Sequence, residues 1–142
     1  DDYIKAGSDI ITFHYEIDEN INDIIDRIKQ EKIKAGIAIK PKTSWEKIKE
    51  YLHSVDQVII MTVEPGFGGQ SFLTDQIEKI KNISHYIKKN NLNVDIEIDG
   101  GVNYETGKLC VDAGANILVA GSFLFKQSSL TIATNKLNDF FN

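Results

Sequence analysis

The sequence has very few of three residue types whose scarcity narrows the class of protein. Its 142 residues include one cysteine, Cys110, two prolines and one arginine, Arg27. A lone cysteine cannot form an intramolecular disulfide, so we expect a reducing compartment and, among these, the cytoplasm. Two prolines exclude a proline-rich linker. With a single arginine, we expect any bound phosphate to be held by backbone N–H groups rather than by guanidinium groups.

The sequence also lacks long apolar runs and an excess of basic charge. The apolar run 58–61 is far shorter than the roughly 20 residues that cross a bilayer, and no basic-then-apolar leader opens the chain. We therefore expect neither a membrane span nor secretion. The formal net charge of -5 disfavours nonspecific binding to nucleic acid, which requires a basic surface. The hydrophobic content of 42% is enough for a core, and we expect one domain over residues 1–142.

What the sequence does contain is a regular alternation of two apolar periods. Runs rich in β-branched residues predict strands, and the segments between them have apolar residues at helical spacing. Strands are expected at 10–13, 35–39, 57–63, 94–98 and 116–120, and helices near 21–28, 45–52, 74–87, 104–113 and 130–141. Thr43 and Glu46 predict a capping box, Asn103 an N-cap and Gly114 a helix stop. This βα repetition predicts a parallel sheet of the α/β class.

The order of elements alone fits both an open doubly wound sheet and a closed barrel. The segment 94–99 favours the barrel, because its aliphatic residues alternate with Asp95, Glu97 and Asp99. A parallel strand covered by helices on both faces is nearly continuously apolar, so an acidic face indicates the polar interior of a barrel. Buried carboxylates need partners, and we expect Lys40 to pair with Glu97.

Glycines cluster where three of the expected strands end, which is where parallel βα folds bind ligands. These clusters are Gly66-Phe67-Gly68-Gly69, Gly100-Gly101 and Gly121-Ser122. Each cluster alone is more typical of a tight turn, but three together predict a cradle of backbone N–H groups for phosphate. A helix beginning after Ser122 would add its dipole. The segment 66–70 is long enough for a lid, and Phe67 is either its cover or an ordinary exposed loop aromatic.

Three other residues have competing interpretations. Asp99 ends a strand beside two glycines, where a carboxylate is a general acid/base, a metal ligand or simply a turn residue. His14 and Glu16 close the first strand, which places His14 as a candidate for the lining of the same mouth of the expected barrel, but a lone histidine is more often structural than a metal ligand. Met61, taken alone, would be a core residue.

Several segments, in this order and roughly at this spacing, resemble the ribulose-phosphate 3-epimerase family. They are Ile11–Glu16, Gly36–Pro41, Met61–Gln70, Glu97–Val102, Ala113–Asn116 and Gly121–Ser122. The similarity runs from about Tyr3 to Phe125, and Met61–Phe72 is its most specific part.

The resemblance implies a (β/α)8 TIM barrel of the ribulose-phosphate-binding type that interconverts D-ribulose 5-phosphate and D-xylulose 5-phosphate in the pentose phosphate pathway. It implies proton exchange at C3 by two aspartates, through an enediolate held on one divalent metal ion (Zn, Fe, Mn or Co), in a homo-oligomer. Asp99 matches an aspartate that is both acid/base and metal ligand, and Met61 matches a methionine beside the intermediate. Positions that bind phosphate and substrate are matched by Gly66, Phe67, Gly68, Gly69, Gly100, Gly101, Gly121 and Ser122.

The five expected strands resemble only the family's fourth to eighth. The first three βα units, which carry the second catalytic aspartate and the other metal ligands, have no counterpart in residues 1–142. We therefore expect the chain to be part of a full epimerase, inactive and unable to hold the metal by itself. Two alternatives stay open: an allulose-6-phosphate 3-epimerase or another barrel acting on phosphosugars or indole phosphates, and a noncatalytic phosphate-binding module.

Overall fold

A computed structural model describes residues 1–142 and contains one parallel sheet. Its strands are β1 (Ile10–His14), β2 (Lys34–Ile39), β3 (Gln57–Met61), β4 (Asp95–Asp99) and β5 (Ile117–Val119). They lie side by side in the order β1-β2-β3-β4-β5, and every pairing is parallel. A spatial order identical to the chain order is that of a barrel, because a doubly wound sheet reverses its order at a switch point. The sheet therefore decides between the two expected architectures in favour of the barrel type.

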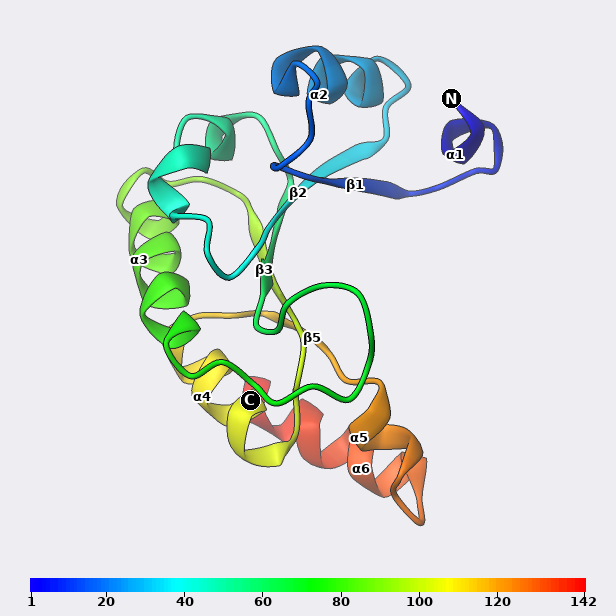
Figure 1. The fold of residues 1–142 in the computed structure, drawn as a ribbon, viewed down its shortest axis with the longest axis vertical. Helices are drawn as coiled ribbons and strands as arrows, with labels where there is room; N and C mark the ends of the chain where they lie inside the picture. Colours follow the sequence, from blue (N-terminus) through cyan, green and yellow to red (C-terminus); the bar gives the residue numbers. More distant parts are fainter.

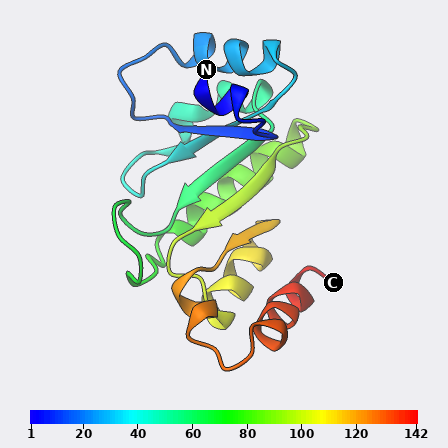
Figure 2. The same cartoon turned by 90° about the vertical axis from the view of Figure 1, so that its right-hand side faces the viewer.

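Helices precede, connect and follow the strands. They are α1 (Asp2–Lys5), α2 (Ile21–Gln30), η1 (Trp45–Ile48), η2 (Tyr51–His53), α3 (Gln76–Lys89), α4 (Tyr104–Ala113), α5 (Ser122–Phe125), α6 (Leu130–Asn138) and η3 (Asp139–Phe141). Figure 1 shows α2, α3 and α4 following one another around the outside of a curved sheet. In the turned view of Figure 2 the same helices lie on one side of the strands. No helix is both long and apolar enough to span a bilayer.

The core lies between the strands and these outer helices. The strand residues Ile37, Ile60 and Ile98 are completely buried. They belong to one apolar cluster that also contains Ile83 of α3. On β4 the alternation works as expected, because its isoleucines are buried in this cluster while its acidic residues are only partly buried. The opposite face of the sheet is thereby left for polar side chains.

The ends of α4 confirm the expected signals, whereas the segment after β2 does not. Asn103 caps α4 in a reciprocal capping box with Thr106, and Gly114 ends it with a φ of 112°. The expected helix 45–52 is instead two short 3₁₀ turns, η1 and η2. The predicted capping box is wrong because the hydroxyl of Thr43 is used elsewhere: it donates to the carboxylate of Glu16.

The expected ion pair between Lys40 and Glu97 is also wrong. The carboxylate of Glu97 accepts a hydrogen bond from the side-chain amide of Gln57 on β3. The register explains the difference, because Glu97 is level with Ile59 on β3 and Ala38 on β2, while Lys40 follows the end of β2 and is exposed. A neutral amide, rather than a cation, therefore satisfies this interior carboxylate.

Both outer strands keep an unpaired edge. β1 pairs only with β2 and β5 only with β4, and the N- and C-termini lie near opposite ends of the sheet in both ribbon views (Figures 1 and 2). Large apolar side chains are exposed near each edge, Tyr3 and Ile10 beside β1 and Val119 and Phe125 beside β5. Such edges and apolar side chains are normally covered by further structure.

Candidate functional site

A cavity of about 790 Å³ opens at the carboxyl ends of the strands. It brings together every site residue expected from the sequence. These ten lining residues are Met61, Gly66, Phe67, Gly68, Gly69, Asp99, Gly100, Gly101, Gly121 and Ser122. They come from the ends of three neighbouring strands, β3, β4 and β5, so the glycine clusters do converge on one space.

The loop after β3 lies against the loop after β5, although about 50 residues separate them in the chain. A methyl group added to Gly68 would lie 3.6 Å from Oγ of Ser122, and one added to Gly69 would lie 3.9 Å from it. The two glycines and the serine hydroxyl therefore border the same part of the cavity, which is the arrangement expected for an anion cradle.

The loop after β4 requires glycine for steric reasons. Gly101 has a φ of 65°, and a Cβ atom there would lie 2.6 Å from the backbone nitrogen of Phe72. Neither that conformation nor that space accommodates a larger residue without displacement of backbone. The glycines after β4 thus let the loops after β3 and β4 approach each other closely.

Two threonines hold the loop after β4 by its carbonyl oxygens. The hydroxyl of Thr62 donates to the carbonyl of Gly100 at 2.6 Å, and the hydroxyl of Thr106 donates to the carbonyl of Gly101 at 3.0 Å. With these carbonyls bonded on the protein side, the loop has a fixed shape beside the cavity. Neither hydrogen bond was expected from the sequence. Thr62 bonds a carbonyl 38 residues further along the chain, and Thr106 bonds one across the turn that precedes α4.

The loop after β3, which we interpreted as a lid, is held together by hydrogen bonds of its own. The side-chain amide of Gln70 donates to the carbonyl oxygens of Glu64, at 2.6 Å, and Phe67, at 2.9 Å. Phe67 lines the cavity and is 74% exposed, so its ring is free to cover a ligand. Both interpretations of Phe67 remain compatible with this position.

Asp99 lies at the end of β4, level with Met61 on β3 and Val119 on β5, and all three line the cavity. Burial raises the pKa of Asp99 above its ordinary value. Burial also raises the pKa of Glu97, the charge of Asp99 raises it further, and the hydrogen bond from Gln57 opposes both. A carboxyl group with a raised pKa exchanges protons more readily near neutral pH, as an acid/base must.

The residues of this chain do not by themselves make a metal site. No group of three or more histidine, cysteine, aspartate or glutamate side chains gathers at a distance that would hold an ion. Asp99 offers one carboxylate, and protein metal sites of the expected kind use three or four ligands. Residues 1–142 therefore do not fit a divalent ion without ligands from elsewhere.

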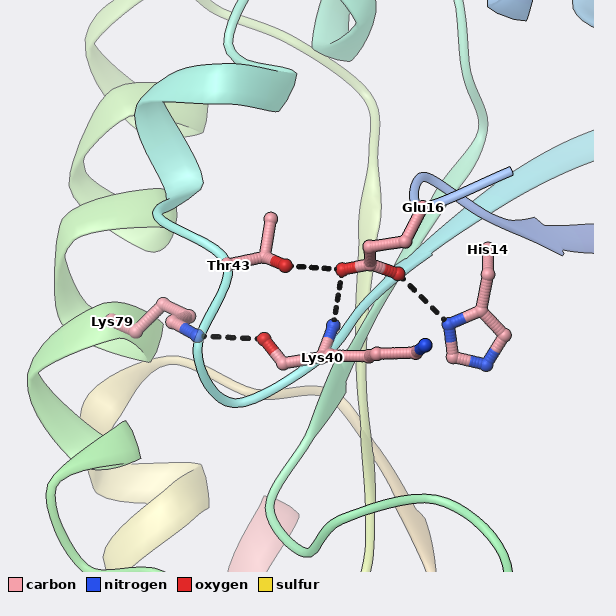
Figure 3. Close-up of polar contacts among 5 residues, drawn as sticks. All are labelled: His14, Glu16, Lys40, Thr43 and Lys79. Carbon is pink, nitrogen blue, oxygen red and sulfur yellow. Dashed lines mark hydrogen bonds and ion pairs between the residues drawn. The ribbon is translucent and has the colours of Figure 1, made fainter. Parts of the chain in front are cut away.

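One cation of the cavity was not expected from the sequence. Lys126, which follows the short helix α5, is the only lysine or arginine in the lining. Its signal in the sequence was a basic residue soon after the last glycine cluster. The helix expected after Ser122 exists, but α5 has only 4 residues and so contributes little dipole. His14 also lines the cavity, as its place at the end of the first expected strand suggested, and its side chain contacts Glu16 (Figure 3).

Comparisons with known proteins identify relatives of this chain. The model of the ribulose-phosphate 3 epimerase family matches residues 1–125. A ribulose-phosphate 3-epimerase of Chlamydia muridarum is 41% identical over 132 residues, which are 92% of this chain and 58% of that protein. One of Bacillus subtilis is 40% identical over 136 residues, 95% of this chain and 63% of that protein. The chain thus spans less than two thirds of the length of these curated relatives.

The fold comparison points to the same architecture. A crystal structure of 3-hexulose-6-phosphate synthase superimposes with a TM-score of 0.64 and 17% identity, covering 96% of this chain and 63% of that one. At that identity the likeness concerns the fold alone. The family match over residues 1–125, with the converging glycine loops and Asp99 inside it, shows that this chain belongs to the ribulose-phosphate 3-epimerase family.

Proposed function

We propose that this chain forms the C-terminal part of a ribulose-phosphate 3-epimerase, which interconverts D-ribulose 5-phosphate and D-xylulose 5-phosphate. The observation that carries the proposal is the single cavity in which Asp99 meets the glycine loops after β3, β4 and β5. On this proposal residues 1–142 would supply one half of an epimerase site, namely a phosphate cradle and one acid/base.

Several groups that line the cavity would have a part in this chemistry. The backbone N–H groups of Gly68, Gly69 and Gly101, with the hydroxyl of Ser122 and the ammonium of Lys126, would bind the phosphate and fix the sugar chain. The carboxylate of Asp99 would remove the C3 proton from one face, and the electron pair of the C–H bond would move toward the C2 carbonyl to form an enediolate.

Completion of the reaction requires a second acid. Return of a proton to the same face of C3 regenerates the substrate, whereas return to the opposite face gives the epimer. Asp99 occupies one face only, so we propose that the second acid lies outside residues 1–142. A divalent metal ion would stabilise the negative charge of the enediolate, and its other ligands would have to lie outside these residues too.

We propose that the missing groups belong to strands that pair with the free edges of β1 and β5. Closure of a barrel requires a partner for both edges, and exposed apolar residues lie beside each of them. The expectations of a homo-oligomer and of a cytoplasmic location rest on the family resemblance and the single cysteine, and we retain both as proposals.

A coupled assay of ribulose 5-phosphate turnover tests the proposed function. We expect the complete protein, including any residues that precede Asp1, to form xylulose 5-phosphate when supplied with Zn, Fe, Mn or Co. The 142-residue chain alone should bind phosphate but form no product. If the complete protein prefers allulose 6-phosphate, the proposed substrate is wrong, but the proposed reaction, epimerisation at C3, still holds. Binding of phosphosugar without exchange of the C3 hydrogen would identify a noncatalytic phosphate-binding module and exclude the epimerase.

A further inference from the structure

His14 is the one imidazole in the lining of the cavity, and the proposed chemistry does not use it. The register places it level with Ala38 on β2, Ile59 on β3 and Glu97 on β4. His14 therefore lies on the same face of the sheet as the interior acids, level with Glu97 and two residues below the level of Asp99. Ala38 beside it is small, which leaves the imidazole open to the cavity.

A fixed carboxylate holds one side of the His14 ring. Nδ1 of His14 lies 3.3 Å from Oε2 of Glu16, and the other oxygen of Glu16 accepts a 2.9 Å hydrogen bond from the backbone N–H of Lys40. The hydroxyl of Thr43 donates to that same oxygen. Figure 3 shows Glu16 between these donors and the imidazole.

The loop that supplies these donors is itself held in place. The ammonium of Lys79 on α3 donates to the carbonyl oxygens of Lys40, at 3.2 Å, and Pro41, at 2.7 Å. A series of hydrogen bonds therefore links α3 to the loop after β2, and that loop to Glu16. The carboxylate of Glu16, held in this way, orients the ring of His14 (Figure 3).

This arrangement selects one tautomer of His14. Burial tends to raise the pKa of Glu16, but hydrogen bonds from Thr43, from the Lys40 backbone and from His14 outweigh it, so the pKa lies below its ordinary value. An ionised carboxylate cannot donate a proton, so Nδ1 of His14 must be the donor in this contact. The neutral ring then carries a lone pair on Nε2, which has no hydrogen-bond partner in the protein.

A lone pair facing the cavity accepts from a hydroxyl group, whereas it repels an anionic phosphate. The phosphate cradle lies on the loops after β3, β4 and β5, and β1 is three strands from β4, about 14 Å along the sheet. A sugar phosphate held in the cradle would run past Asp99 toward β1. Its hydroxyl end would thus approach His14, and curvature of the sheet shortens the path (Figure 1).

We propose that His14 is a specificity-determining residue whose Nε2 accepts a hydrogen bond from the terminal hydroxyl group of the substrate, at the end opposite the phosphate. The inference rests on the proposed function and goes further, because it assigns the residue that reads the far end of the sugar. Glu16 is then a positioning residue that fixes the tautomer of His14.

Two substitutions at His14 distinguish the contributions of its two ring nitrogens. In His14→Asn the amide nitrogen takes the place of Nδ1 and keeps the contact with Glu16, but nothing occupies the place of Nε2. In His14→Gln the amide reaches the place of Nε2. We would assay the complete protein on ribulose 5-phosphate and on its 1-deoxy analogue, which lacks the terminal hydroxyl group.

We expect His14→Asn to raise KM for ribulose 5-phosphate about tenfold, the value of one hydrogen bond, and to leave binding of the analogue unchanged. His14→Gln should recover most of the loss. An equal effect of His14→Asn on both compounds would overturn the inference, since a merely structural role weakens both alike. If the unsubstituted protein turns over ribulose 5-phosphate at no detectable rate, the proposed function itself fails.

A spectroscopic measurement tests the same inference without activity. Nitrogen NMR of the complete protein at high pH should show His14 as the Nδ1–H tautomer, and Glu16→Gln, whose amide can donate, should shift it toward Nε2–H. An Nε2–H tautomer in the unsubstituted protein would contradict the inference.

Discussion

The hydroxyl of Thr62 donates a 2.6 Å hydrogen bond to the carbonyl oxygen of Gly100, across two neighbouring strand ends. Thr62 is completely buried, and it also donates to the carbonyl of Asp99 at 3.2 Å. A single buried side chain therefore joins the loop after β3 to the residue that we propose as the acid/base.

Replacement of Thr62 by valine keeps its shape and removes its hydroxyl. We expect the free energy of unfolding to fall by about 1 kcal/mol, the net value of one hydrogen bond, because the partly buried carbonyl of Gly100 loses its partner. Urea unfolding of the chain measures this, and Thr62→Ser, which keeps the hydroxyl, is the control for the lost bond. A valine variant as stable as the unsubstituted chain would show that this hydrogen bond does not contribute to the free energy of unfolding.

Removal of the positive charge of Lys126 should weaken phosphate binding. In Lys126→Gln we expect the dissociation constant of inorganic phosphate to rise about three- to tenfold at low salt, with a smaller effect at high salt because the charge is partly screened. Lys136→Gln is the matched control, since Lys136 lies over the ring of Tyr104 and does not line the cavity. A phosphate titration followed by NMR measures the dissociation constant of each variant. An equal loss of affinity in both variants would show that the phosphate binds elsewhere.

The contact network of Glu16 should make stability depend on pH. Because hydrogen bonds hold its pKa below the ordinary 4.5, the folded chain takes up a proton on Glu16 less readily than the unfolded chain. The stabilisation is present above pH 4.5 and is lost as the pH falls through the lowered pKa. We expect Glu16→Gln to be less stable than the unsubstituted chain at pH 6 and the difference to shrink below pH 4.5. A difference independent of pH would contradict this account.

Cys110 should be unreactive in the folded chain. It is completely buried on α4, and burial raises the pKa of its thiol to about 12, so almost no thiolate exists at neutral pH. A thiol reagent should therefore label Cys110 only as fast as the chain unfolds, and at once in denaturant. Immediate labelling without denaturant would show that α4 does not stay packed on the sheet.

The sequence predicted those parts of the molecule that depend on local patterns. The alternation of acids on β4 identified a polar interior, and the glycine clusters identified the loops that converge on the cavity. These features could be predicted because strand period and backbone freedom are properties of neighbouring residues.

Contacts between distant residues were not predictable in this way. Thr43 was expected to cap a helix, but its hydroxyl bonds Glu16, 27 residues away, and the helix became 3₁₀ turns. Glu97 was expected to meet Lys40, but a neutral Gln57 lies nearer in the sheet. In both cases the sequence supplied a chemically sensible partner, and the register of strands and loops chose another.

Exchange of the C3 hydrogen of ribulose 5-phosphate with solvent deuterium tests the central claim most directly. We predict that the complete protein, including any residues that precede Asp1, exchanges this hydrogen and forms xylulose 5-phosphate. In Asp99→Asn both rates should fall by about 100- to 10,000-fold, the usual contribution of a general acid/base, with phosphate binding retained. Undiminished exchange in Asp99→Asn, or none in the unsubstituted protein, would contradict the account.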